Sequence, residues 1–188
     1  MSKHGVEPIR KAALINATIS EVGRAGSLDV TVAQIARAAG MSPALAHHYF
    51  GSKEQIFLSA MRHILTVYGR SIRDGLPAGD ARERLNAIVR INFAPSNFQR
   101  EIISAWINFY ALALINKQAA RLLRIYHRRL RSNLISNLRP LTDHPIRTAE
   151  TLGALIDGLY LRAVLTPGPV DADKALSTIM DYIEEALA

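Results

Sequence analysis

Apolar residues recur every three to four positions along almost the whole chain, and no stretch alternates apolar and polar residues long enough to indicate a β-strand. This spacing predicts an all-α protein. Glycine and proline divide the pattern into separate helical segments. The expected helices run from Pro8 to about residue 23, and over residues 32–39, 43–50, 53–76, 80–93, 98–115, 117–138, 145–165 and 171–187.

Residues that cap helices mark the short segments near the N-terminus. Thr31 and Gln34 have the spacing of a capping box, in which each side chain bonds the backbone N–H of the other residue. Gly40 then supplies a position that tolerates positive φ, as a sharp turn requires. Ser42 can cap the next helix, with Pro43 at its first position. These signals predict two short helices joined by a tight turn.

The segment lengths divide the chain into two parts. The first three helices form a small N-terminal head, residues 1–52. One long helix leads from it into a larger helical body, residues 53–188. We therefore expect a helix-turn-helix domain followed by a ligand-binding and dimerisation domain.

The turn around Gly40 has the properties of a DNA-reading helix-turn-helix. Ile35 and Ala36 give the helix before the turn a small apolar face, so it can pack closely. The helix after the turn is too short to stand alone. Small residues at its N-terminus allow approach to base edges and phosphates. The predicted DNA-binding residues are Thr31, Gln34, Ser42, Pro43, Ala44, Leu45, His47, His48, Tyr49 and Lys53.

The charge balance also indicates a polyanionic partner. The chain carries 23 Lys and Arg against 16 Asp and Glu, a formal net charge of +7. The excess is uneven, because residues 61–140 carry 14 basic and 4 acidic side chains whereas residues 141–188 carry 3 and 8. Nucleic acid is the first candidate for such a chain. The alternative is that the arginine-rich middle pairs with the acidic C-terminal segment.

The sequence excludes several classes of protein. It has no cysteine, so disulfides, thiolate zinc sites and thiol catalysis are ruled out. Its longest nearly apolar run, residues 105–115, falls short of the roughly 20 residues that a membrane helix needs. MSKHGVEPIR at the start lacks the apolar core of a signal peptide. We expect a soluble cytoplasmic protein with no membrane partner.

Enzyme motifs are missing as well. The chain has no P-loop, no nucleophile elbow and no dinucleotide-binding glycine fingerprint. His47 and His48 are adjacent, so they point about 100° apart on a helix and do not form a metal site. We predict no catalytic residue, no metal and no cofactor. A purely structural helical module remains an alternative, although it leaves the turn chemistry of the head unexplained.

Aromatic residues in the body form a second candidate site. Trp106, Phe109 and Tyr110 stand at i, i+3 and i+4, on one face of one helix. Aromatic faces together with one carboxylate, here Asp157, suit an organic cation. The alternatives are ordinary core packing of the rings and pairing of Asp157 with Arg162 or with a group across a dimer. The predicted ligand-binding residues are Trp106, Phe109, Tyr110, Tyr126, Asp157 and Tyr160.

The last two helices have apolar stripes that predict a homodimer. Two such helices from each subunit would form a four-helix bundle across a two-fold axis. The dimer would then present its recognition helices to successive major grooves, about 34–36 Å apart, on a near-palindromic operator. The predicted interface residues are Leu152, Leu155, Ile156, Leu159, Leu176, Ile179, Met180 and Ile183.

The segment TVAQIARAAGMSPALAHHYFGSKEQIF resembles the DNA-binding signature of the TetR family of repressors. The matching positions are Ala39-Gly40 with Ser42, the run His48-Tyr49-Phe50, and Lys53-Glu54. The chain differs from the family pattern at Pro43-Ala44 and His47. Because these positions can touch DNA, the resemblance implies the mode of DNA binding and leaves the operator sequence open.

The resemblance extends over essentially the whole chain. GVEPIRKAALINATI, SAWINFYALAL, YHRRLRSNLISNLR and ALIDGLYLRAVL are similar to the choline-responsive repressors of glycine betaine synthesis, a branch of the same family. The resemblance implies control of genes that take up choline and oxidise it to glycine betaine, with choline relieving repression. The alternative is a repressor of the same type that responds to another small organic cation.

Overall fold

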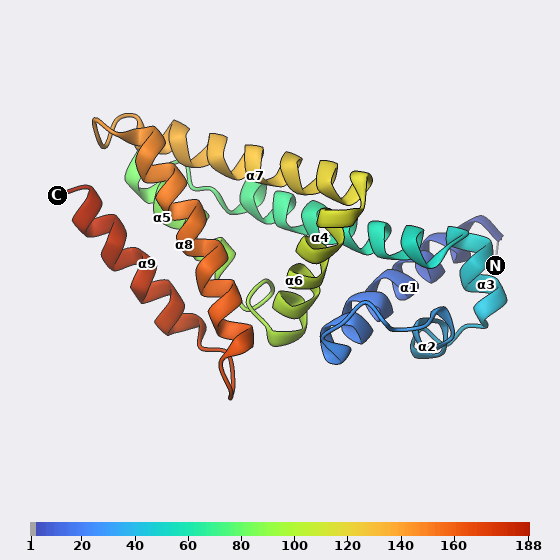
Figure 1. The fold of residues 1–188 in the computed structure, drawn as a ribbon. Helices are drawn as coiled ribbons and strands as arrows, with labels where there is room; N and C mark the ends of the chain where they lie inside the picture. Colours follow the sequence, from blue (N-terminus) through green and yellow to red (C-terminus); the bar gives the residue numbers. More distant parts are fainter. Residues whose placement is uncertain (1–2) are drawn as a thin grey trace.

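A computed structural model describes residues 3–188, and this part of the chain folds into nine helices without a β-strand (Figure 1). The all-α prediction is confirmed. The helices are α1 (Lys3–Ala25), α2 (Val32–Ala38), α3 (Pro43–Phe50), α4 (Lys53–Gly75), α5 (Ala81–Asn92), α6 (Arg100–Ile115), α7 (Lys117–Leu138), α8 (Pro145–Leu165) and α9 (Ala172–Ala186).

The predicted start of the first helix is wrong. α1 begins at Lys3, and Pro8 lies inside it. Proline disrupts a helix interior by removing one N–H and by crowding the carbonyl four residues earlier. Because Pro8 lies close to the start of α1, few helical turns precede it, and so little of the helix is disturbed. The other helix ends lie within two residues of the sequence-based expectation.

The turn signals of the head form as expected. The backbone N–H of Gln34 donates to Thr31 Oγ1 at 3.1 Å, and the Thr31 N–H donates to Gln34 Oε1 at 2.7 Å, which completes the capping box. Gly40 adopts φ +69°, in the left-handed region that glycine enters without strain. α2 and α3 are therefore set at their angle by local sequence.

The helices gather into a head at one end and a body at the other (Figure 1). α1, α2 and α3 form the head, and α4 leads from them into the body. There α4 packs against α5 and α7, while α8 packs against α6, α7 and α9. None of the described helices is long and apolar enough to cross a membrane.

α1 and α6 form the closest contact between head and body. At Gly23 of α1, an added Cβ would lie 2.3 Å from the carbonyl oxygen of Glu101 and 2.7 Å from its Cα. Only glycine allows two helix backbones to approach this closely. The first turn of α6 is therefore seated directly on the end of α1.

The predicted dimer surface is corrected at four of its eight positions. Leu152, Ile156, Ile179 and Ile183 are at most 1% exposed, because α8 and α9 turn them toward the rest of their own subunit. They have no area to offer a second copy. The remaining four, Leu155, Leu159, Leu176 and Met180, are half-buried. The large apolar side chains that α8 exposes are instead Ile146, Leu161 and Leu165.

Internal pairing accounts for part of the basic excess. Arg131 of α7 bonds Glu150 of α8 at 3.2 Å, and Arg82 of α5 pairs with Glu184 of α9. Both pairs join the arginine-rich middle to the acidic C-terminal segment. Each is exposed, so it contributes at most about 1 kcal/mol.

Gly23→Ala should destabilise the protein, although alanine is the better helix former. The new methyl group would meet backbone atoms that cannot rotate away, and overpacking of this kind costs about 1–3 kcal/mol. The gain in helix propensity recovers only about 1 kcal/mol. We expect a lower melting temperature at fixed protein concentration.

The matched control is Gly69→Ala in α4, where an added Cβ meets no atom within 4 Å. This variant should melt at the same temperature or slightly higher. Equal melting temperatures for Gly23→Ala and wild type would contradict the close contact of α1 with α6.

Candidate functional site

The N-terminal end of α3 is exposed on the head. Ser42, Pro43 and Ala44 are all exposed, and the Ser42 hydroxyl accepts a hydrogen bond from the Leu45 N–H at 3.3 Å. Ala46 on the opposite face is fully buried and anchors the helix. This arrangement leaves small side chains at an exposed helix N-terminus, as approach to a phosphate requires.

The polar residues at the C-terminal end of α3 differ in what they contact. His47 and His48 are exposed, and His47 Nδ1 lies 3.1 Å from the Gly51 carbonyl. Tyr49 is half-buried, with the Lys11 ammonium of α1 5.8 Å from its ring centroid. Tyr49 therefore also helps to hold α3 against α1.

Three further candidates flank α3. Thr31 and Gln34 bond each other in the capping box, so part of their hydrogen-bonding capacity is used inside the protein. Lys53 opens α4, and its ammonium lies 5.5 Å from the ring centroid of Phe57. A half-exposed lysine at this place can still reach a bound anion.

In the body, five of the six predicted ligand residues line one cavity, which we name the aromatic cavity. The Trp106 ring lies 5.9 Å from Tyr110 on α6 and 5.1 Å from Tyr126 on α7, measured between centroids. The Tyr110 hydroxyl donates to Asp157 Oδ1 at 2.9 Å. The five residues are Trp106, Tyr110, Tyr126, Asp157 and Tyr160.

Phe109 does not line this cavity. It is 0% exposed and packs in the core, and it is not among the residues that line the cavity. Residues at i, i+3 and i+4 share a broad face, but the cavity lies along only one edge of that face. Phe109 is therefore an ordinary core residue, which was the alternative considered for the aromatic rings.

The structure adds five residues that sequence reasoning missed. Of these five, only Tyr68 of α4 could have been identified from the sequence, because it stands four residues from both Ile64 and Ile72 on the buried face of a helix. The polar amides come from the end of α5 and the loop after it, where no periodicity applies. The added residues are Tyr68, Asn92, Asn97, Ile107 and Ile156.

Hydrogen bonds and ring contacts hold one side of the cavity together. The Tyr160 hydroxyl donates to the Asn92 carbonyl, and the Asn92 side-chain amide donates to the Ile88 carbonyl at 2.8 Å. The Tyr160 ring lies 5.0 Å from Phe98 and 5.9 Å from Phe93. This side is therefore rigid.

Asp157 gives the aromatic cavity its negative charge. Burial raises the pKa of Asp157 above its ordinary value, and the Tyr110 hydrogen bond and the nearby His127 offset this only in part. The His127 Nε2 atom lies 3.8 Å from Asp157 Oδ2. Within residues 6–188, whose side chains the structure describes, no lysine or arginine pairs with this carboxylate, so Arg162 does not take the role considered for it.

The aromatic cavity is nearly closed in this structure. Its volume is about 20 Å³, room for about one water molecule. A larger ligand therefore has to spread the rings before it enters.

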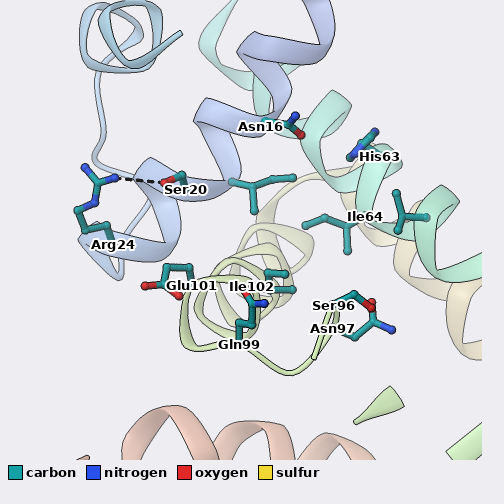
Figure 2. A pocket seen from close by; sticks show the side chains of 12 residues that line it. Asn16, Ser20, Arg24, His63, Ile64, Ser96, Asn97, Gln99, Glu101 and Ile102 are labelled. Atoms are coloured by element: carbon teal, nitrogen blue, oxygen red, sulfur yellow. Dashed lines mark hydrogen bonds between the residues drawn. The ribbon is translucent and has the colours of Figure 1, made fainter. Parts of the chain in front are cut away.

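A larger cavity lies at the junction of head and body, and we name it the joint cavity. Figure 2 shows its space between α1, α4 and the start of α6, with a volume of about 450 Å³. Arg24, His63 and Glu101 bring charge of both signs, and no Trp, Tyr or Phe lines it. Its lining suits water and polar groups better than a quaternary ammonium. Asn97 lines both cavities.

Family comparisons match both parts of the chain. Residues 14–60 match bacterial regulatory proteins of the tetR family, and residues 81–188 match the C-terminal domain of the BetI-type transcriptional repressors. The HTH-type transcriptional regulator BetI of Brucella suis biovar 1 is 48% identical over 186 residues, 97% of this chain and 94% of that protein. BetI of Rhizobium meliloti is 43% identical over 193 residues, covering 100% and 94%.

Solved structures of other regulators share the fold. A transcriptional regulator from Saccharomonospora viridis, solved in complex with choline, superposes with a TM-score of 0.83 at 24% identity, over 93% of this chain and 95% of that one. A TetR regulator from Haloarcula marismortui gives 0.85 at 21% identity, over 96% and 100%. These relatives are transcriptional regulators and not enzymes. The chain therefore belongs to the TetR family of transcriptional repressors, with a C-terminal domain of the BetI type.

Proposed function

We propose that this protein represses the genes of choline uptake and glycine betaine synthesis, and that choline relieves the repression. The observation that carries the proposal is the aromatic cavity, which is lined by five aromatic rings and by one carboxylate that has no lysine or arginine partner among the described residues. Sequence identity to the BetI regulators and the choline complex of a structural neighbour support it. As a regulator of bacterial operators, it would act in the cytoplasm.

The aromatic cavity matches the chemistry of a quaternary ammonium. Such a cation donates no hydrogen bond, so a protein recognises it by the negative faces of rings and by one opposite charge. The Trp106 and Tyr110 rings supply the negative faces, and Asp157 supplies the opposite charge. Each desolvated ring contact contributes up to about 2 kcal/mol.

The head, residues 1–52, would read the operator while the body, residues 53–188, binds the effector. α3 would lie in a major groove, with its small N-terminal residues near the bases and Lys53 near a phosphate. The proposed DNA-contacting residues are Thr31, Gln34, Ser42, Pro43, Ala44, Leu45, His47, His48, Tyr49 and Lys53.

α8 and α9 would form the dimer interface. Their half-buried residues Leu155, Leu159, Leu176 and Met180 are available for it, together with the exposed Leu161 and Leu165. A two-fold bundle of these helices would set the two heads about 34–36 Å apart, the spacing of successive major grooves on a near-palindromic operator.

The switch would follow from the small volume of the aromatic cavity. Because about 20 Å³ cannot hold choline, the cation would stabilise a conformation in which the rings stand further apart. Trp106 and Tyr110 belong to α6, whose first turn is seated on Gly23 of α1. Movement of α6 would therefore reorient the head and weaken DNA binding. A different small organic cation would act in the same way.

Choline should weaken operator binding through Trp106. In a fluorescence anisotropy titration with DNA from upstream of the protein's own gene, millimolar choline should lower the affinity of the wild type. Trp106→Leu keeps an apolar side chain but removes the ring. It should raise the dissociation constant for choline about tenfold, the equivalent of about 1.4 kcal/mol.

Phe109→Leu is the matched control, because Phe109 lies on the same helix but outside the cavity. Its choline affinity, measured by calorimetry, should equal that of the wild type. Equal choline affinity in folded Trp106→Leu would place the cation elsewhere. DNA binding that ignores choline would leave a repressor with another effector, and no DNA binding at low salt would refute the repressor.

Choline binding should weaken as the solution is acidified. The pKa of Asp157 is raised in the ligand-free protein, and a bound cation favours the charged carboxylate, so protonation competes with choline. Below the pKa of Asp157 in the free protein, the dissociation constant should rise about tenfold per pH unit, and above it the constant should level off. Calorimetry at several pH values measures this.

Asp157→Asn should bind choline weakly and with little dependence on pH. His127→Gln tests the neighbouring group, since His127 also faces the carboxylate. If the pH dependence persists in Asp157→Asn and disappears in His127→Gln, then the histidine and not Asp157 is the titrating residue.

Lys53 should contribute one phosphate contact in each subunit. Log affinity for DNA falls linearly with log salt concentration, with a slope of about −0.9 per phosphate contact. Lys53→Gln should reduce the steepness of this slope by about 0.9 per subunit. Lys174→Gln, which removes an exposed lysine from α9, should leave the slope unchanged. Equal slopes for the two variants would exclude Lys53 from the DNA interface.

A further inference from the structure

Tyr68 has an unusual hydroxyl group. It lies on α4, and its ring meets the Tyr126 ring edge-on at a centroid distance of 5.4 Å. The hydroxyl oxygen is buried and has no hydrogen-bond partner within residues 3–188. Buried polar groups are nearly always hydrogen-bonded in folded proteins, so an unpaired one at a cavity indicates a partner that is not part of the chain.

Three of the neighbouring polar side chains in the aromatic cavity already have hydrogen-bond partners within the protein. The Tyr110 hydroxyl donates to Asp157, and the Tyr160 hydroxyl donates to the Asn92 carbonyl. The Asn92 amide donates to the Ile88 carbonyl. Its side chain also acts to lower the pKa of Tyr68, but the Tyr68 hydroxyl has no partner in hydrogen-bonding geometry among the described residues. The cavity therefore holds a free hydroxyl at Tyr68.

This hydroxyl also keeps its proton. Burial raises the pKa of Tyr68 to about 12, and the effect of Asn92 offsets this only in part. A neutral phenol both donates and accepts hydrogen bonds. The partner that it suits is an alcohol, which can accept from it or donate to it.

We propose that Tyr68 hydrogen-bonds the hydroxyl group of the effector, and so selects a quaternary ammonium alcohol over a quaternary ammonium without an alcohol. The inference rests on the proposed function, because it assumes that the cation occupies the aromatic cavity. Asp157 of α8 and the rings recognise the charged end. Tyr68 of α4 recognises the other end.

The position of Tyr68 adds a consequence for the switch. Of the residues that line the aromatic cavity, Tyr68 is the one that α4 supplies, and α4 begins directly after the head at Lys53. A ligand bonded to Tyr68 is thereby attached to the helix that leads into the DNA-binding end of the molecule.

The test compares two cations of nearly equal size. Choline and ethyltrimethylammonium differ only in the hydroxyl group, and calorimetry gives the dissociation constant of each for the full-length protein. In the wild type, choline should bind about tenfold more tightly. In Tyr68→Phe the preference should fall to about twofold or less, with the affinity for ethyltrimethylammonium nearly unchanged.

Tyr182→Phe of α9 is the matched control, since it removes a tyrosine hydroxyl that does not line the aromatic cavity. It should keep the full preference for choline. The ligand-free melting temperature is a second readout. Because the Tyr68 hydroxyl has no partner in the protein, Tyr68→Phe should melt at the wild-type temperature or above.

The outcomes separate this inference from the proposed function. If the wild type binds choline and Tyr68→Phe keeps the wild-type preference, the inference is overturned and the proposed function stands. A lowered melting temperature of ligand-free Tyr68→Phe would also overturn it, since the hydroxyl would then have a structural partner. If neither cation binds the wild type, the proposed function itself fails.

Discussion

The connection between the head and the body of this protein depends on the contact between α1 and α6. At Gly23 the helices approach so closely that no side chain fits between them. Five residues after Glu101, the same helix carries the first ring of the aromatic cavity, Trp106. A helix is stiff over this distance, which is about 8 Å at 1.5 Å per residue. The cavity and the head are therefore mechanically close, although α9 lies at the end of the molecule opposite the head (Figure 1).

Within the body, the electrostatics of one carboxylate set the character of the cavity. Desolvation favours the neutral form of Asp157, while the Tyr110 hydroxyl and His127 favour the charged form. Because of these opposing influences, the protein compensates the charge of the carboxylate only in part. A permanent cation completes this compensation without a proton transfer, whereas a neutral ligand of the same size would leave the half-buried carboxylate with only Tyr110 and His127 beside it. Among the described residues no arginine of α7 pairs with it, and Arg131 instead bonds Glu150, two turns earlier on α8.

Local signals in the sequence were enough for the helices and the turn of the head. Capping by Thr31 and Gln34 and the positive φ at Gly40 depend on neighbours within a few residues, so the sequence contains everything needed to predict them. The same holds for grouping Trp106 with Tyr110, because helix geometry alone puts residues four apart on one face. The start of α1 was missed because a proline near a helix N-terminus is compatible with several registers.

Tertiary structure decided which apolar faces are buried and what lies opposite them. Leu152 and Ile179 form stripes that fit a dimer interface equally well, yet α8 and α9 turn them into their own subunit. Phe109 shares a face with Trp106 but lies beyond the edge of the cavity. The approach of Tyr68 from α4 depends on the packing of distant segments. Periodicity identifies an apolar face, but burial against the same chain and burial against another molecule use the same side chains. Only the packed fold distinguishes the two.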